Sequence, residues 1–328
     1  MTVSREDLEA SLLRLAADVR DPRAGLFGPS SKVWQVNREA AIFLGAGRAA
    51  LLQTAHPFVA TGVDQHSKTK TDPVGRFART FEAVFAMVYG DQDHAFKAAR
   101  TVHSIHRRIT GTIPERVGSF ASGSRYAANT DEALFWVHAT LWDTSIQCFE
   151  LIVRPLSNAE KNTYYEETKR FAALFGIPDA VIPPTWGDFV EYNAQAFEAP
   201  WLAVGREGAD IVRFLLKPPT IALAPMWRTF GVLTAGLLPP RVRELYELPF
   251  GRLERGIFDG AIRTIRASYP HLPPSVRHLP PYRTAMDTLG EQPDTALGKA
   301  LARAYASMSK RRARAHFTAG RAEGTPAR

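Results

Sequence analysis

Apolar positions recur every three or four residues along most of the chain, and no segment alternates apolar and polar residues over a sustained stretch. The first spacing is typical of amphipathic helices, whereas alternation would indicate strands. Leu8, Leu12 and Leu15 show the helical spacing near the start of the chain. Further helical patterns cover residues 40–53, 73–89, 92–110, 131–153, 158–175, 186–198, 206–216, 240–247, 251–267 and 296–314. The sequence therefore predicts an all-α protein.

Prolines and glycines mark the boundaries of these helices. Asp72-Pro73 predicts a helix start, because an acid at the cap followed by proline at the first helical position suits both residues. Gly90 and Gly111 predict helix ends. Prolines crowd residues 178–184, 218–219, 239–240 and 270–281, and no internal repeat is visible. We expect one helical domain over residues 1–298, with an irregular, proline-punctuated C-terminal half, followed by a basic tail over residues 299–328.

The positive charge lies mostly in that tail. The whole chain has a formal net charge of +8, of which residues 299–328 carry +7 and the other 298 residues +1. A nearly neutral body does not favour a nucleic-acid-binding face, so no nucleic-acid partner is expected. We expect the tail to be a solvated helix end, with weak contact to an anionic membrane as the alternative.

The start of the chain and its longest apolar stretch indicate the expected cellular location. The start, MTVSREDLEASLLRLAADVRD, mixes acids with bases and has no apolar core of signal-peptide length. The stretch from Thr220 to Leu238 is interrupted by Pro225 and Arg228, which favours a buried helix over a membrane span. The single cysteine, Cys148, excludes an internal disulfide and a cysteine-based zinc site. A cytoplasmic protein is expected, with peripheral membrane contact as the alternative.

Two glycines in AIFLGAGRAA mimic a dinucleotide-binding loop. Gly45 and Gly47 form a G-x-G-x-x-A pattern, and Asp64 follows where the ribose-binding acid would stand. That fingerprint requires a strand before the glycines, and the short, Ala-rich AAIFL is a poor strand. An NAD(P)-binding oxidoreductase is therefore the weakest alternative. The glycines are expected instead to let another backbone or a flat ligand lie close to a helix.

Three histidines on two predicted helices could carry chemistry. His103 and His106 share one face of their helix, and His138 lies in an apolar stretch of another. Histidines in such positions are usually hydrogen-bonded core residues. The chain has no HExxH or Glu-x-x-His motif, which disfavours zinc-protease and di-iron sites. A haem requires only one axial imidazole and an apolar slot, so it fits these residues best.

The helix predicted from Pro73 carries a further polar pair. Arg76 and Thr80 are four residues apart and therefore share a face, where they could hold a carboxylate such as a haem propionate. The neighbouring Phe77, Phe81 and Phe85, together with Trp136 from a later helix, are expected to line an apolar slot.

Several motifs resemble one known family. They are LGAGRAALLQTAHPFVATGVDQHS, DPVGRFARTFEAVFAMVYGD, HSIHRRITGTIP and LFWVHATLWDTS, followed by GLLPPRVRELYELPF and HLPPYRTA. Together they resemble the catalytic domain shared by latex-clearing rubber oxygenases and the MpaB-type oxygenase. The resemblance covers roughly residues 35–285 in order.

The resemblance implies a helical domain that encloses a non-covalent haem b. His106 would be the proximal iron ligand, and His103, Arg76 and Thr80 would lie around the haem. Gly45, Gly47 and His138 complete the expected cofactor-binding set. Arg79 stands where rubber oxygenases can place a lysine that caps the iron, but a guanidinium stays protonated and is a poor ligand. Asp64 is the candidate catalytic base.

These observations predict a haem b-dependent oxygenase, an oxidoreductase in which His-ligated iron activates O2 for reaction with a small hydrophobic, isoprenoid-like or lipid-like substrate. Cleavage of a solid polymer outside the cell is not expected, because no secretion signal is visible. A haem-binding carrier or sensor without turnover is the main alternative.

Overall fold

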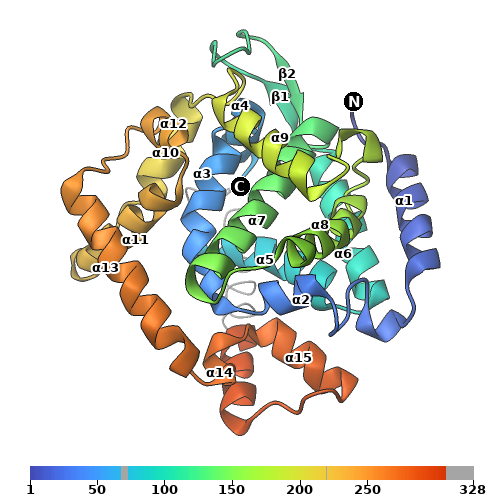
Figure 1. The fold of residues 1–328 in the computed structure, drawn as a ribbon. Helices are drawn as coiled ribbons and strands as arrows, with labels where there is room; N and C mark the ends of the chain where they lie inside the picture. The colour runs from blue at the N-terminus through green and yellow to red at the C-terminus, as the bar shows by residue number, and fades with distance from the viewer. Residues whose placement is uncertain (68–72, 219, 308–328) are drawn as a thin grey trace, which may run out of the picture.

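Helices make up almost all the regular structure of the computed structural model, which describes residues 1–67, 73–218 and 220–307 (Figure 1). Side chains of residues 73–78 lie outside this description. The elements of the first half are α1 (Arg5–Asp18), η1 (Pro22–Ala24), α2 (Lys32–Asn37), η2 (Ala40–Gly45), α3 (Ala46–Thr54), α4 (Pro57–His66), α5 (Pro73–Tyr89), α6 (Gln92–His106), β1 (Thr110–Thr112), β2 (Arg125–Ala127) and α7 (Asp131–Ile152). The predicted all-α class is confirmed.

The second half consists of shorter helices separated by the predicted proline joints. They are α8 (Asn158–Ala173), η3 (Asp179–Val181), α9 (Trp186–Glu198), α10 (Arg206–Leu215), η4 (Ile221–Leu223), α11 (Ala224–Leu237), α12 (Pro240–Leu245), α13 (Arg252–Ser268), η5 (Tyr269–His271), α14 (Pro274–Arg277) and α15 (Pro280–Leu289). A last helical segment covers residues 296–307. In the described part of the chain, no helix combines the length and apolarity that crossing a bilayer requires.

The long helix α7 passes through the middle of the molecule (Figure 1). It contacts α2, η2, α3, α8 and α13, so helices surround it. Its buried side chains accordingly include residues on all faces, among them Trp136, His138 and Phe149. A helix that is apolar all round is typical of such a central position.

One predicted helix is shorter than expected. The pattern over residues 92–110 predicts a single helix, but α6 ends at His106 and Thr110–Thr112 forms β1, which pairs antiparallel with β2. The carbonyl of Ile109 accepts a hydrogen bond from the backbone N–H of Ala128 at 2.9 Å. Pairing with a distant segment thus replaces the last helical turn, and it sets the end of α6 beside the hairpin.

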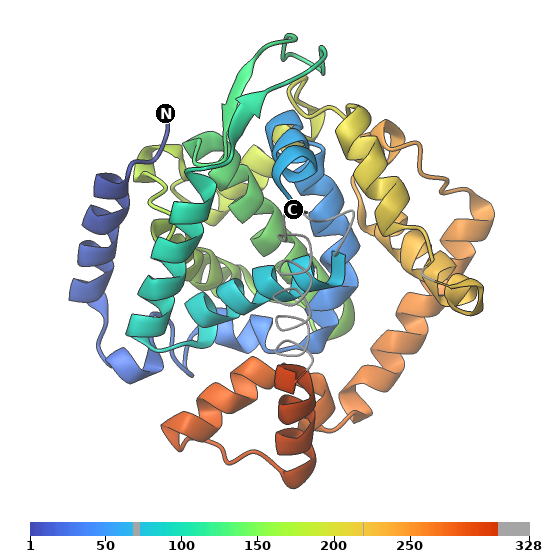
Figure 2. The ribbon, with the colours of Figure 1, turned by 180° about the vertical axis from the view of Figure 1, so that it is seen from behind.

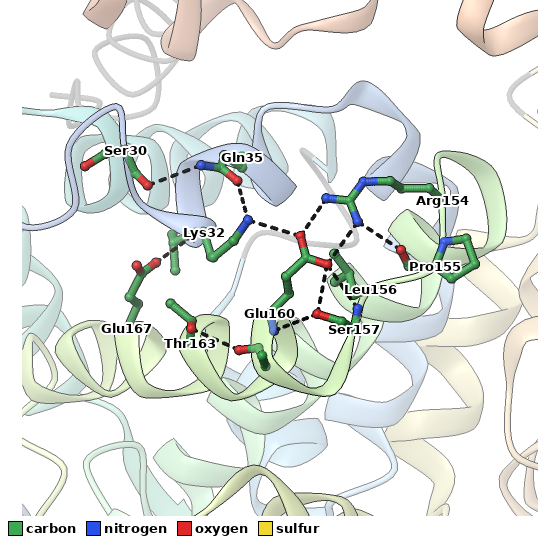
Figure 3. Close-up of polar contacts among 12 residues, drawn as sticks. Ser30, Lys32, Gln35, Arg154, Pro155, Leu156, Ser157, Glu160, Thr163 and Glu167 are labelled. Carbon is green, nitrogen blue, oxygen red and sulfur yellow. Dashed lines mark hydrogen bonds and ion pairs between the residues drawn. The ribbon is translucent and has the colours of Figure 1, made fainter.

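A charged cluster fixes α2 and the end of α7 to α8 (Figure 3). The Glu160 carboxylate accepts hydrogen bonds from Arg154 at 2.7 and 3.1 Å and from Lys32 at 3.1 Å. It also completes a capping box with Ser157 at the start of α8. Hydrogen bonds from Arg154, and to a smaller extent from Ser157 and Lys32, hold the pKa of Glu160 well below its usual range.

A buried carboxylate ties the C-terminal helices to the body. Glu39, whose side chain is 2% exposed, accepts a hydrogen bond from Tyr269 Oη at 3.0 Å and from Arg277 Nη2 at 3.2 Å. His278 Nε2 lies 3.5 Å from the same carboxylate. Burial opposes ionisation of Glu39, but His278, Arg277 and Tyr269 outweigh it and lower its pKa.

The first part of the predicted tail is packed. Ala302 and Tyr305 of helix 296–307 line a hollow of about 430 Å³ together with Phe85 of α5 and Thr284 of α15. The basic cluster after residue 307, and with it the predicted membrane contact of the tail, lies outside the described residues. The division at residue 298 stays a prediction.

Candidate functional site

The end of α6 meets the end of α4 at the β1–β2 hairpin. In Figure 2, α6 rises from its junction with α5 to this hairpin. The Gly62 position of α4 faces Ile109 and Tyr126, each of which would lie 3.5 Å from a Cβ added there. Tyr126 of β2 donates a hydrogen bond to Gln65 Oε1 at 2.7 Å. Residues of α4, β2 and the chain just after α6 therefore meet at the base of the hairpin.

His103 is buried and held by Asn129, in the short connection between β2 and α7. The side-chain Nδ2 of Asn129 lies 3.2 Å from His103 Nδ1 and 3.5 Å from the His103 carbonyl oxygen. Because a carbonyl only accepts, Nδ2 is the donor, so His103 Nδ1 accepts and its Nε2 carries the proton in the neutral ring. Burial lowers the pKa of His103, and Arg107 and Arg5 add to this effect.

His106 ends α6 with a half-buried ring. Its Nδ1 is buried and has no hydrogen-bond partner of ordinary geometry among the described residues. Burial lowers the pKa of His106 to about 4, and His103 contributes, while Asn129 acts in the opposite direction. The ring is therefore neutral at physiological pH. A neutral imidazole with an unsatisfied nitrogen is the form that binds a metal ion.

His138 has a different environment. Its Nδ1 accepts a hydrogen bond from Trp142 Nε1 at 3.0 Å, and its ring stacks on Phe135 at 5.6 Å. An indole N–H can only donate, so the proton of neutral His138 is on Nε2 and neither nitrogen offers a lone pair. Burial lowers the pKa of His138 to about 3. The residue is a core histidine, and the structure brings it into contact with aromatic rings rather than with His103 or His106.

Asp64, the candidate base, lies on α4, two residues after Gly62. It stands three residues before the end of the chain segment described there. Burial raises the pKa of Tyr126 on β2, and the charge of Asp64 adds to this effect.

The residues of α5 divide into those that are described and those that are not. Arg79 and Thr80 have exposed side chains, whereas the side chains of Arg76 and Phe77 lie outside the described residues. Phe81 packs on Phe85 and on Phe43 of η2, with ring centroids 5.8 and 4.9 Å away. An apolar aromatic surface therefore follows Thr80 along α5.

The sequence predicted that Trp136 lines an aromatic slot with Phe81 and Phe85, and this prediction is wrong. Trp136 does not join Phe81 and Phe85. Its indole N–H donates to the carbonyl of Leu52 at 3.0 Å, and its ring meets Trp201 at 5.2 Å. The residue is fully buried in a separate cluster of α3, α7 and the segment after α9.

Gly45 and Gly47 let helices approach closely. A Cβ at residue 45 would lie 2.2 Å from Thr144 Cγ2 and 2.7 Å from Cys148 Sγ, both on α7. A Cβ at residue 47 would lie 2.1 Å from Thr234 Oγ1 of α11. The sequence left open whether another backbone or a flat ligand lies beside these glycines. In the structure, side chains of the neighbouring helices α7 and α11 fill this space.

The dinucleotide-loop alternative fails on its secondary structure. The chain before Gly45 forms α2 and η2, where a Rossmann fingerprint requires a strand. Gly45 instead caps the N-terminus of α3, and Asp64 lies in the following helix, α4. The NAD(P) reading of these residues is therefore wrong.

Sequence reasoning missed two buried polar residues. Asn129 positions His103, yet in the sequence it looks like an ordinary residue before a helix. Arg48 donates to the carbonyl of Leu237 at 2.9 Å, to Asp143 Oδ2 at 2.6 Å and to Thr144 Oγ1 at 2.5 Å. An arginine inside the apolar stretch 40–53 was the available signal, because a buried charge must be paired.

No three His, Cys, Asp or Glu side chains of the described chain are grouped as metal ligands. Residues 33–267 match the family described as the catalytic domain of the ER-bound oxygenase mpaB/B′ and rubber oxygenase. The chain belongs to this oxygenase family. The resemblance found in the motifs is thereby confirmed.

Two curated relatives are similar over part of the chain. An uncharacterized protein of Mycobacterium bovis and one of Mycobacterium tuberculosis are each 26% identical over 165 residues, which is 49% of this chain. The chain spans 61% of the length of these relatives. No solved structure is significantly similar to it.

Proposed function

We propose that this member of the oxygenase family is a haem b-dependent oxygenase that acts on a small hydrophobic substrate. The observation that carries the proposal is the pairing of a neutral His106, with an unsatisfied buried Nδ1, and the Asn129-held His103 at the end of α6. Family membership supplies the oxygenase class. The haem, the ligand and the substrate class are the proposal.

The chemistry of the residues at the end of α6 fits a haem. His106 is the residue that would hold the iron, because its ring is neutral and its buried Nδ1 makes no hydrogen bond of ordinary geometry with a described residue. His138 does not fit, because Trp142 occupies its only lone pair. Arg76 and Thr80, on the face of α5 predicted from their spacing, would hold a propionate. When bound, the haem iron supplies O2 activation, which no side chain of the chain provides.

The other side chains of the proposed site have separate roles. Asn129 fixes the ring of His103 and keeps its proton on Nε2. Phe43, Phe81 and Phe85 present an apolar surface that suits a hydrophobic substrate and excludes water. Arg79 stays protonated, so it contributes charge rather than a sixth ligand. Asp64 of α4 is the carboxylate that would accept a proton.

The haem content of two variants tests the proposal. We expect the purified protein to show a Soret band and a positive pyridine haemochromogen reaction. His106→Ala should lose most of the haem, because the axial bond is lost. His138→Ala should keep its haem stoichiometry despite a lower melting temperature, because it removes a core side chain. A wild-type protein without haem, or a His106→Ala variant with full haem content and an unchanged spectrum, would contradict the assignment.

Turnover separates the oxygenase from a carrier or sensor. O2 consumption by the haem-loaded protein should rise when isoprenoid or lipid-like compounds are added. A stable haem protein that consumes no O2 with any of them would favour the carrier or sensor.

A further inference from the structure

The connection between α10 and α11 exposes an unusual number of apolar side chains. Ile221 is 93% exposed, Met226 is 55% exposed and Leu223 is 37% exposed, and Ala222 and Pro225 between them are also exposed. Scattered exposed apolar residues are normal on a protein surface, but a contiguous group marks a surface that contacts another apolar phase. We name residues 220–228 the α10–α11 tip.

The tip is held in place by its own hydrogen bonds. Trp227 Nε1 donates to the carbonyl of Leu215 at 3.0 Å, which ties the first turn of α11 to the end of α10. The backbone N–H of Leu223 donates to the carbonyl of Thr220 at 3.1 Å. The Trp227 ring lies 6.0 Å from Phe230, whose Cζ would be 3.1 Å from a Cβ at residue 47. Because these contacts fix the backbone, the apolar side chains of the tip stay presented to solvent.

The tip lies at the rim of the molecule, on the side opposite α1, in both views (Figure 1 and Figure 2). Farther along α11 the pattern reverses, and Val232, Leu233 and Leu237 are buried. The apolar stretch predicted from the sequence to be a buried helix is therefore buried only in its second half. The first half carries an apolar surface outward from a rigid base.

Charge decides between the partners that such a surface could contact. From Ile211 to Arg243 the chain has no Asp or Glu, and Lys217 and Arg228 are exposed on either side of the apolar residues. Two-fold pairing with a second copy would bring these like charges together, which is unfavourable. An anionic lipid headgroup layer above a hydrocarbon phase matches both the charge and the apolar side chains.

We propose that the α10–α11 tip docks the protein on an anionic phospholipid membrane, with Ile221, Leu223 and Met226 inserted among the acyl chains. Lys217 and Arg228 contact the headgroups. The contact is peripheral and goes beyond the oxygenase function proposed above, since lipid binding by the tip requires no haem. It would place the enzyme at the phase from which a hydrophobic substrate partitions.

Co-sedimentation of the full chain with vesicles tests the proposal. We expect binding to phosphatidylcholine vesicles that contain phosphatidylserine, and weaker binding to phosphatidylcholine alone. The double variant Ile221→Glu/Met226→Glu should reduce the partition coefficient by about tenfold or more, because apolar burial is replaced by burial of charge. Lys217→Glu or Arg228→Glu should each reduce it roughly fivefold at low salt. Leu13→Glu, at a 72% exposed leucine of α1, is the matched control and should bind as the wild type does.

Three outcomes would overturn the proposal. The first is a wild-type chain that does not bind either kind of vesicle. The second is an Ile221→Glu/Met226→Glu variant that binds as well as wild type, with binding lost instead on truncation after Ser307, which would assign the contact to the tail. The third is a wild-type dimer that this double variant converts to a monomer without any change in vesicle binding, which would make a second copy the partner. Circular dichroism of each variant checks that the fold is retained.

Discussion

Replacing Gly45 by alanine should separate a packing role from a cofactor role at this position. The backbone of Gly45 has φ −84°, which any residue can adopt, so the substitution carries no conformational penalty. The added Cβ would lie 2.2 Å from Thr144 Cγ2 and 2.7 Å from Cys148 Sγ, well inside van der Waals contact. Either α3 moves away from α7, or Thr144 rotates and weakens its hydrogen bond to Arg48.

The magnitude follows from these contacts. Overpacking of a core costs about 1–3 kcal/mol, and loss of a hydrogen bond to a charged group costs about 1.5–3 kcal/mol. Alanine also lowers the conformational entropy of the unfolded chain relative to glycine, which stabilises the folded protein by only about 0.4–1 kcal/mol. We therefore expect a net destabilisation of about 1–3 kcal/mol, and a fall in melting temperature of about 2–4 °C for each kcal/mol.

Thermal unfolding followed by circular dichroism, on haem-free protein at one scan rate, measures the effect. Thr144→Ser in the Gly45→Ala background should restore part of the stability, because it removes Cγ2 and keeps the hydroxyl that Arg48 contacts. A Gly45→Ala variant that melts like the wild type and loses only its haem would refute the packing argument. That result would show that the glycine faces the cofactor.

Three further predictions concern charged and titratable side chains. If Arg76 anchors a propionate, Arg76→Leu should weaken haem retention about ten- to a hundredfold and Arg79→Leu should do so less; equal losses would indicate general damage to α5. Burial lowers the pKa of His138 to about 3 and that of His56 to about 4, from 6.5, so their contribution to stability is complete above pH 6.5 and is lost as the pH falls toward 4. Each histidine should add about 1.4 kcal/mol per pH unit to that slope, and His56→Gln/His138→Gln should flatten the acid limb measured by urea unfolding. Arg48→Met, which leaves a carboxylate and a buried carbonyl without their donor, should cost about 3–5 kcal/mol; a loss below 1 kcal/mol would mean that water replaces the guanidinium.

Local sequence signals determined the helices of this protein. Pro73 begins α5 and Gly90 follows its last residue, as the sequence predicts, because proline and glycine act on the backbone of their own turn. The spacing of Leu8, Leu12 and Leu15 likewise buries one face of α1. These features depend on residues at most four positions apart, so the sequence alone contains them.

Contacts between distant segments decided where α6 ends and what the histidines can do. The hydrogen bond from Ala128 to Ile109 stops the helix one turn earlier than its apolar pattern predicts. The same hairpin brings Asn129 to His103. The tautomer of His138 is set locally, by Trp142 one turn later on α7. Sequence reasoning found the three histidines as a group, because it identifies residue types and helix faces. Only the family resemblance singled out His106 as the iron ligand. The residue pattern could not rank the three, because the proton position on each ring depends on its hydrogen-bond partner.

The same division holds for the glycines and for the apolar stretch Thr220–Leu238. The sequence determined that Gly45 and Gly47 permit close approach and that the stretch is apolar. Only the tertiary structure decided that α7 and α11 are the approaching helices, and that Val232 is buried while Ile221 is exposed. Hydrophobicity is a property of a side chain and can be read from the sequence. Burial depends on which other elements cover that side chain, and this is set by how the whole chain packs.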